Sequence, residues 1–276
     1  MLNASTRQPV FFISHGGGPW PWMPEVFATT YAKLAQSLSS LLKTLPQRPQ
    51  AILMVSAHWE EQVFTVQTAT QPEMIYDYGG FPAHTYQIHY PSAGSPELAH
   101  QVTQLLEQNA IAVKTDERRG YDHGMFSPMQ VINPAADIPV VQLSLKKGLN
   151  PQEHLGLGRA LAPLRDQNIL IVGSGLSYHN LRMFNAQAAE PSKMFDQWLY
   201  ESVVECQGGE RQQRLIDWQQ APAARIAHPR EEHLLPLMVA VGAAENENGA
   251  RNYHESTFMG GLSVSSFVFG STLGNT

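Results

Sequence analysis

The chain has 276 residues, of which 43% are hydrophobic, so it can form one large α/β domain or two small ones with a sizeable core. Charged residues make up only 15%, and the formal net charge of −6 argues against a nucleic-acid partner, which would require a basic patch. The single cysteine, Cys206, excludes a disulfide framework and a cysteine-based metal site.

The sequence offers no signal for secretion or membrane insertion. The N-terminal residues MLNASTRQPVFF have no positive region followed by an apolar core of signal-peptide length. No run reaches about 18 consecutive apolar residues, the length that a membrane span needs. We therefore expect a cytoplasmic protein with no membrane partner, and the composition leaves a homo-oligomer open.

The first predicted strand covers residues 9–14, PVFFIS, and is followed by His15 and three glycines. Glycines 16–18 allow the backbone to approach a ligand closely and to adopt positive φ. No GK[ST] follows them, which excludes a Walker loop, and the spacing also fails the GxGxxG dinucleotide pattern.

Two tryptophans and a helix follow the glycines. Trp20 and Trp22 either line an aromatic pocket or cover the core, and the sequence leaves both readings open. Apolar residues at steps of three and four predict one amphipathic helix over 27–45. Two prolines, Pro46 and Pro49, end it before the next strand, so this region is a predicted β-α-β unit with a right-handed crossover.

The stretch AILMVSAHW, residues 51–59, contains a short unbroken apolar run that predicts a strand over 51–57, buried on both faces of a parallel sheet. His58 comes at its carboxyl end. Ligand sites in open α/β sheets lie outside the carboxyl ends of the strands, so His58 is a candidate functional residue.

A strand near a sheet edge is predicted over 62–68, followed by a long loop over 71–95. Loops of this length without regular structure are usually functional or disordered, and five aromatic residues argue against disorder. We therefore expect the loop to form an active-site wall. Ser95 and Pro96 then supply an N-cap and a first helical residue for the next helix.

The middle of the chain is predicted to alternate strands and helices. Short strands are expected over 111–114 and 138–145, and a helix capped by Asn150 over 150–165. Between the two strands lies an Asp-His-Gly sequence, residues 122–124. Asp122 there can orient His123 and Gly124 permits a tight turn, although a turn alone would explain the motif.

A third apolar strand, residues 169–174, is followed by His179 and Asn180. Three strands with a histidine at or just past the carboxyl end would bring three imidazoles to one rim of the sheet. Such clusters suit iron, zinc, copper or nickel. For any single one of these residues, a histidine satisfied within the structure is the ordinary alternative.

The C-terminal third is predicted to hold two helices and a closing sheet segment. One helix covers 191–206, and sheet-like sequence covers 262–270. In HPREEHLLPL, Pro229 predicts a helix start with its glutamates in the first turn, where the helix dipole favours them. His233 would lie one turn into this buried helix, which Pro236 would kink.

These elements together predict an α/β fold: a single three-layer domain over residues 1–276, with a central, largely parallel mixed sheet flanked by helices on both faces.

The motifs HGGGPW, VSAHW, YDYGGFP, DHG, HN and HPREEHLLPL occur in this order along nearly the whole chain. In this order and spacing the sequence resembles the DODA-type subgroup of the class III (LigB-like) extradiol ring-cleaving dioxygenases. The resemblance implies a nonhaem Fe(II) enzyme that uses O₂ to open a catechol ring, such as that of DOPA, next to its two hydroxyls.

The resemblance also implies roles for five histidines. His15, His58 and His233 match the family's metal ligands. His179, in HN, matches the acid–base histidine and is counted among the candidate metal ligands as well. His123, in DHG, matches the histidine that contacts substrate or oxygen.

The third ligand is open between two neighbours, because the wider class III family uses a glutamate where this sequence has both Glu232 and His233. Adjacent helical residues point about 100° apart, so only one of them can face a metal. We expect His233 to do so, because it adjoins the buried face, while Glu232 stays near the helix terminus and solvent.

Two other functions use the same residues. A zinc hydrolase would hold Zn(II) with three protein ligands and a water, and Zn(II) also outcompetes Fe(II) at nitrogen sites, so zinc in the purified protein would not decide between them. A non-catalytic metal-binding module on the same fold is the second alternative, and retention of both His123 and His179 argues against it.

Overall fold

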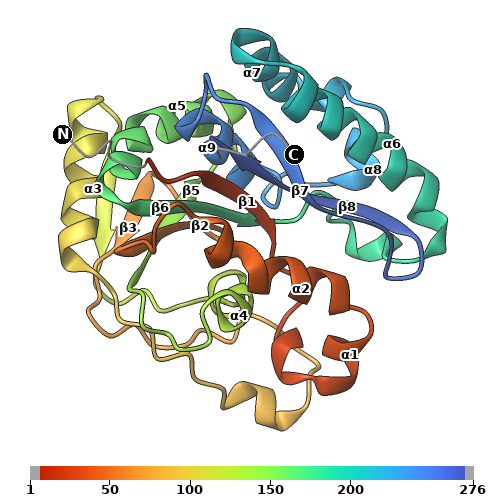
Figure 1. Ribbon diagram of the computed structural model, residues 1–276, viewed down its shortest axis with the longest axis horizontal. Coiled ribbons are helices and arrows are strands. Elements are labelled where there is room, and N and C mark those ends of the chain that lie inside the picture. Colours follow the sequence, from red (N-terminus) through yellow and green to blue (C-terminus); the bar gives the residue numbers. More distant parts are fainter. Residues whose placement is uncertain (1–6, 271–276) are drawn as a thin grey trace.

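A computed structural model describes residues 7–270, and one eight-stranded sheet runs through its centre in the order β4-β3-β5-β2-β6-β1-β8-β7 (Figure 1). The strands are β1 (Val10–Ser14), β2 (Ala51–Glu61), β3 (Phe64–Gln67), β4 (Val113–Asp116), β5 (Val140–Lys146), β6 (Ile169–Gly175), β7 (Gly249–Phe258) and β8 (Leu262–Phe269). Strands β1, β6, β2 and β5 pair in parallel, as do β3 and β4. The β1–β8, β7–β8 and β3–β5 pairs are antiparallel, which confirms the predicted mixed sheet.

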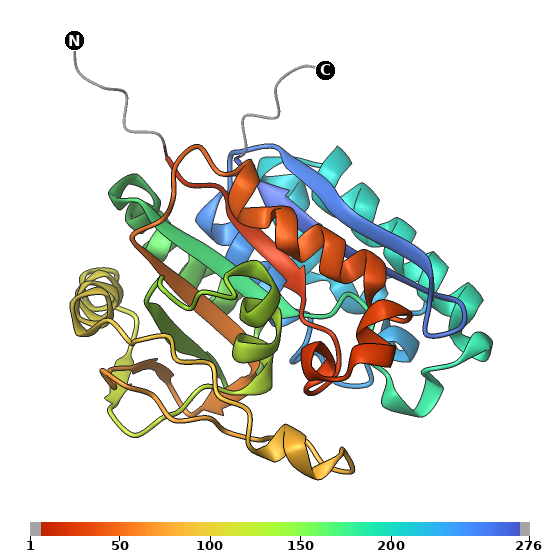
Figure 2. The ribbon, with the colours of Figure 1, turned by 60° about the horizontal axis from the view of Figure 1, so that its bottom comes forward.

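Helices cover both faces of this sheet, so the predicted three-layer α/β architecture is confirmed (Figures 1 and 2). Helices α2 and α4 pack on one face, and α5 and α9 on the other. The α-helices are α1 (Pro24–Ala28), α2 (Ala32–Ser40), α3 (Pro96–Gln108), α4 (His123–Ile132), α5 (Pro151–Leu161), α6 (Ala189–Tyr200), α7 (Gly208–Ile216), α8 (Ala224–Ala227) and α9 (Leu235–Ala243). The single domain over residues 1–276 stays a prediction.

Helix α9 lies between α5 and the sheet, and every one of its residues is buried. Two glycines of β6 allow α9 and the turn before it to approach the sheet. A Cβ on Gly173 would lie 2.3 Å from the carbonyl oxygen of Pro236, and one on Gly175 would lie 2.1 Å from that of His233. Although α9 is apolar, it is short. None of the helices between residues 7 and 270 is both long and apolar enough to cross a membrane.

The predicted single helix over 27–45 is wrong, because the chain bends after α1 and resumes as α2 and a 3₁₀ turn at Leu41–Thr44. Two β-branched threonines, Thr29 and Thr30, weaken helix propensity at the bend. The bend places the ring of Tyr31 on that of Trp20, with centroids 4.7 Å apart, so tertiary stacking overrides the helical period.

The predicted helix start at Pro229 is also wrong. Residues 228–234 form an irregular turn, and α9 begins only at Leu235, so Pro236 lies in its first turn rather than at a kink. The carbonyl oxygen of His233 accepts from the backbone N–H of Leu176, at 3.1 Å, just past β6. This long-range bond holds the segment against the sheet in place of a helical bond.

Smaller differences concern the ends of elements and the α-helices and strands that the sequence did not predict, which are α4, α7, α8 and β7. β2 continues to Glu61 with a register shift between Val55 and Glu60, so His58 lies within an irregular part of the strand rather than past its end. The Asp-His-Gly sequence opens α4 instead of forming an isolated turn. The predicted helices over 150–165 and 191–206 end as a 3₁₀ segment, Ala162–Gln167, and a π-helical segment, Glu201–Glu205.

Candidate metal centre

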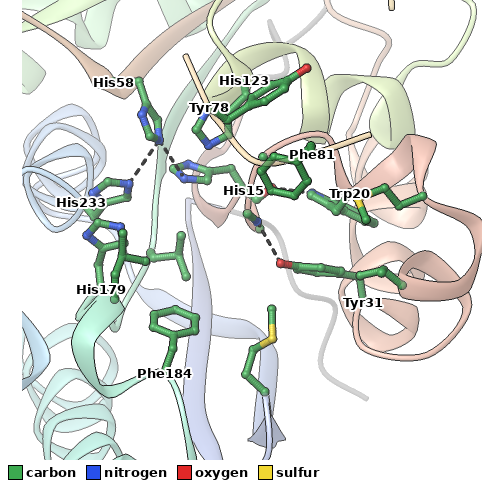
Figure 3. A pocket seen from close by; sticks show the side chains of 18 of the residues that line it. His15, Trp20, Tyr31, His58, Tyr78, Phe81, His123, His179, Phe184 and His233 are labelled. Atoms are coloured by element: carbon green, nitrogen blue, oxygen red, sulfur yellow. Dashed lines mark hydrogen bonds between the residues drawn. The ribbon is translucent and has the colours of Figure 1, made fainter. Parts of the chain in front are cut away.

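Three histidines from separate segments meet at the carboxyl edge of the central strands (Figure 3). His15 follows β1, His58 lies in β2, and His233 precedes α9. The Nε2 atom of His58 lies 3.3 Å from that of His15 and 3.2 Å from that of His233. Since β6 separates β1 from β2 in the sheet and carries the turn against which His233 is held, the fold itself brings these three together.

The second nitrogen of each imidazole has a polar partner. The Nδ1 atom of His15 lies 3.1 Å from Ser174 Oγ, which itself donates to the carbonyl oxygen of Gly124 and therefore accepts from the histidine. The Nδ1 atom of His58 lies 3.2 Å from Asp77 Oδ2. The Nδ1 atom of His233 lies 2.9 Å from Glu232 Oε1. Acceptors at all three Nδ1 atoms place the protons there, so three unprotonated Nε2 atoms face one another.

Burial keeps two of these imidazoles, those of His15 and His233, neutral. Desolvation, together with the neighbouring histidines, holds the pKa of His15 and the pKa of His233 well below their usual value. Three imidazole nitrogens whose lone pairs converge fit a divalent transition metal, and hydrogen-bond acceptors behind the ligands are usual at such a site. The donor set suits Fe(II) and Zn(II) alike.

His123 lies beside this trio and is held by an aspartate that the sequence reasoning missed. Its Nδ1 atom lies 2.8 Å from Asp77 Oδ1, and its ring centroid lies 4.0 Å from that of His58. Burial alone would raise the pKa of Asp77, but the hydrogen bonds from His123 and His58 outweigh it and hold that pKa below its usual range. One ionised carboxylate therefore orients both histidines.

Asp122, the residue expected to orient His123, has a structural role instead. Its buried carboxylate accepts from Ser56 Oγ at 2.7 Å, from Gln142 Nε2 at 2.8 Å and from Arg119 Nη2 at 2.8 Å. It therefore ties the first turn of α4 to β2 and β5. No local signal separates the two aspartates, because Asp77 lies 46 residues from the histidine that it holds.

His179 stacks on His233, with ring centroids 3.4 Å apart, and forms a second group with Glu232 and His233. Its Nδ1 atom lies 3.2 Å from Glu232 Oε1. Its backbone N–H donates to the carbonyl oxygen of Ala227, and the side chain of Asn180 donates to that of Ile226. The two histidine-bearing turns are thus fixed to each other.

Glu232 does not lie at a helix terminus in solvent as expected, because no helix starts there and its side chain is only 13% exposed. Burial alone would raise its pKa, but the hydrogen bond from His179 and the charge of Arg230 outweigh this and keep the pKa below its usual value. The carboxylate therefore stays ionised and accepts from both His179 and His233 rather than joining the Nε2 trio.

A cavity of about 660 Å³ opens from the histidines. The long loop, which was predicted to form a wall of the site, contributes Asp77, Tyr78, Gly79 and Phe81 to the cavity lining. Its Tyr76 instead packs within the loop and donates to the carbonyl oxygen of Ile88. Trp20 lines the cavity and donates from Nε1 to the carbonyl oxygen of His15 at 2.7 Å, which fixes the turn that carries His15. Trp22 packs on Phe126 instead and does not line the cavity.

Comparison with known proteins identifies the family. Residues 10–270 match the family described as the catalytic LigB subunit of aromatic ring-opening dioxygenase. The chain is 38% identical to the 4,5-DOPA dioxygenase extradiol of Beta vulgaris, covering 99% of this chain and 100% of that protein, and 34% identical to the one of Escherichia coli K12, covering 98% and 97%. It is also similar to a solved structure, that of uncharacterized protein JW3007 from Escherichia coli K12, with a TM-score of 0.77, 32% identity and coverage of 96% and 100%. The chain therefore belongs to the LigB family of aromatic ring-opening dioxygenases.

Proposed function

We propose that this protein is an extradiol dioxygenase that opens a catechol ring with O₂ at one nonhaem Fe(II) ion held by His15, His58 and His233. The main support is the convergence of three Nε2 atoms on one wall of a cavity, with that of His58 lying 3.3 Å from that of His15 and 3.2 Å from that of His233. Family membership and relatives named 4,5-DOPA dioxygenase extradiol support the reaction class. Iron supplies the redox chemistry between catechol and O₂ that Zn(II) lacks.

The proposed proton-transfer group is His179. Because Glu232 accepts from its Nδ1 atom, the unprotonated Nε2 is the atom able to take a proton from a catechol hydroxyl and to return it later in the reaction. The ionised Glu232 stabilises the imidazolium that forms in between. His123, whose Nδ1 is bound to Asp77, likewise presents Nε2 to substrate or oxygen.

Ring opening adds both atoms of O₂ across one carbon–carbon bond of the catechol, and the product is a muconic semialdehyde. The flat aromatic ring would lie between the histidines and the wall formed by Tyr78 and Phe81. A catechol offers two oxygens to one metal, whereas a monophenol offers one, so monophenols should bind poorly.

The decisive experiment strips the metal with a chelator under anaerobic conditions and reloads matched samples with Fe(II) or Zn(II). We expect the Fe(II) protein to consume one O₂ per catechol with a yellow product, and the Zn(II) protein to consume none. Equal turnover by the zinc form would contradict the proposed metal. Zinc-dependent ester hydrolysis without O₂ uptake would favour the hydrolase, and metal binding without any turnover would favour the non-catalytic module.

Two further expectations stay predictions. Cell fractionation measures the proposed cytoplasmic location, and light scattering of the purified protein measures whether it is a homo-oligomer.

A further inference from the structure

Away from the histidines, the cavity wall is apolar and continuous. The ring of Tyr31 stacks on Trp20, with centroids 4.7 Å apart, and meets Phe258 at 5.5 Å, which in turn meets Phe184 at 6.4 Å. Figure 3 shows Tyr31 and Phe184 on the side of the cavity away from His58. Aliphatic side chains complete this wall: Met23, Val26, Leu181 and Met259.

The same wall lacks a positive charge. Among the described residues that line the cavity there is no lysine or arginine, and Asp77, whose carboxylate is taken up by two histidines, is the one acid. Two arginines, Arg182 and Arg230, line an adjoining hollow that shares only His179 and Leu181 with the cavity. Arg230 is already paired with Glu60.

A charged substituent on the substrate would therefore be poorly accommodated. A carboxylate moved from water into an apolar environment loses its hydration, and it is tolerated only where a cation or several hydrogen-bond donors replace the water. An uncharged substituent gains from the same burial.

One neutral donor interrupts the apolar wall. The hydroxyl oxygen of Tyr31 accepts from the backbone N–H of Gly17 at 3.0 Å, and its own hydrogen has no acceptor among residues 7–270. The side chain is 97% buried, and burial raises the pKa of Tyr31 to about 12, so the hydroxyl keeps its proton. It can donate to a neutral oxygen on a ligand in the cavity.

We propose, building on the proposed dioxygenase activity, that the preferred substrate is a catechol with an uncharged, largely apolar ring substituent whose neutral carbonyl or ether oxygen accepts from Tyr31. The amino-acid side chain of DOPA, with its ammonium and carboxylate, is disfavoured. This preference departs from the substrate that the relatives' names give for those proteins.

The test compares catechols of similar size whose ring substituents are neutral or charged. Binding of 4-propylcatechol, methyl 3-(3,4-dihydroxyphenyl)propanoate, its free acid and DOPA is measured on the Zn(II)-loaded protein, where no turnover is expected. The ester should bind at least 10-fold more tightly than the acid, and DOPA should bind no better than the acid. Equal or tighter binding of the acid or of DOPA would overturn the inference.

The same four compounds are then compared by kcat/KM with the Fe(II) protein, which separates the two proposals. Cleavage of all four with DOPA preferred would refute the substrate class and leave the dioxygenase intact. A binding preference for the ester without cleavage of any catechol would refute the dioxygenase and leave the inference on the cavity intact.

Three variants test whether the apolar cavity wall causes the preference for an uncharged substituent. Leu181 is 73% exposed at the cavity, so Leu181→Arg should fold, supply the missing cation and reduce the ester-to-acid binding ratio at least 10-fold. Met194→Arg, at an exposed position of α6 away from the cavity, is the matched control for added charge and should leave the ratio within twofold. Tyr31→Phe should weaken the ester about fivefold and spare 4-propylcatechol. Unchanged selectivity in Leu181→Arg, or equal losses for both ligands in Tyr31→Phe, would contradict the proposed wall.

Discussion

Asp77 binds His123 twice through a single oxygen: its Oδ1 atom lies 2.8 Å from Nδ1 and 3.1 Å from the backbone nitrogen of His123. Its other oxygen, Oδ2, lies 3.2 Å from Nδ1 of His58. A residue of the long loop thus fixes both the first turn of α4 and a proposed metal ligand. The loop acts on the site mainly through this carboxylate.

Asp77→Asn should therefore lower metal affinity without unfolding the protein. An amide offers one acceptor oxygen, so it cannot accept from both imidazoles, and its NH₂ group would face an N–H. Loss of such a partner behind a ligand typically costs about 10- to 100-fold in metal affinity or activity. Metal retained after dialysis against increasing chelator measures the effect. Asp137→Asn, at an exposed ion pair with Arg48, is the control, and wild-type retention by Asp77→Asn would refute the role.

Gly124 should tolerate no side chain, although it lies in a helix. A Cβ there would lie 2.6 Å from Ser56 Oγ and 2.9 Å from Cδ2 of His58, and the serine is held by Asp122. We expect Gly124→Ala to displace the imidazole and reduce metal affinity at least 10-fold, measured by the same chelator dialysis.

A matched control distinguishes crowding from helix propensity. Gly156, within α5, has only a flexible arginine atom at 3.8 Å from its would-be Cβ. Gly156→Ala should therefore raise stability by up to about 1 kcal/mol, the usual gain from glycine to alanine in a helix. If Gly124→Ala gave the same gain and kept its metal, the crowding argument would fail.

The sequence predicts the site best where local pattern determines structure. Short apolar runs with β-branched residues identify β1, β2 and β6, and because parallel strands end at one edge, His15 and His58 are expected to meet. The prediction fails where distant contacts decide. Nothing near Tyr31 encodes its stacking on Trp20, and nothing near His233 encodes the bond from Leu176 that replaces a helical turn.

Outside the site, a buried histidine predicts how stability depends on pH. His154 donates from Nδ1 to the carbonyl oxygen of Asn150, accepts at Nε2 from the backbone N–H of Lys146, and is fully buried. Desolvation lowers the pKa of His154 to about 4. Between that value and the pKa of about 6.5 in the unfolded chain, histidine binds a proton in the unfolded chain but not in the folded one. The free energy of unfolding therefore rises with pH over this range and decreases as pH falls.

Protonation of His154 alone should lower the free energy of unfolding by about 2 kcal/mol between pH 7 and pH 5. His154→Gln should therefore show a shallower loss than the wild type in urea unfolding measured at both pH values. His100→Gln, at an exposed position of α3, is the control and should follow the wild type. If His154→Gln lost as much stability between the two pH values as the wild type does, His154 would already carry its proton in the folded state.

The last prediction separates the roles of His233, Glu232 and His179, which lie within one hydrogen-bonded group. His233→Ala should lose metal, because it removes one of three converging Nε2 atoms. Glu232→Ala should keep a weaker site, with about 10- to 100-fold lower affinity, because it removes only the acceptor behind His233. His179→Ala should keep most of the metal and lose ring cleavage by about 10²-fold or more, the usual effect of a positioned proton-transfer group.

Metal content after chelation and reconstitution, measured beside O₂ uptake, distinguishes these outcomes. Glu232→Gln sharpens the test, since the amide still accepts from one imidazole and cannot stabilise an imidazolium by charge: it should retain more metal than Glu232→Ala and yet cleave catechol poorly. Complete metal loss in Glu232→Ala with metal kept in His233→Ala would make the carboxylate the third ligand. Complete metal loss in His179→Ala would place that histidine among the ligands. The proton transfer would then have to be assigned to His123, the cavity histidine outside the Nε2 trio whose Nδ1 is bound to a carboxylate.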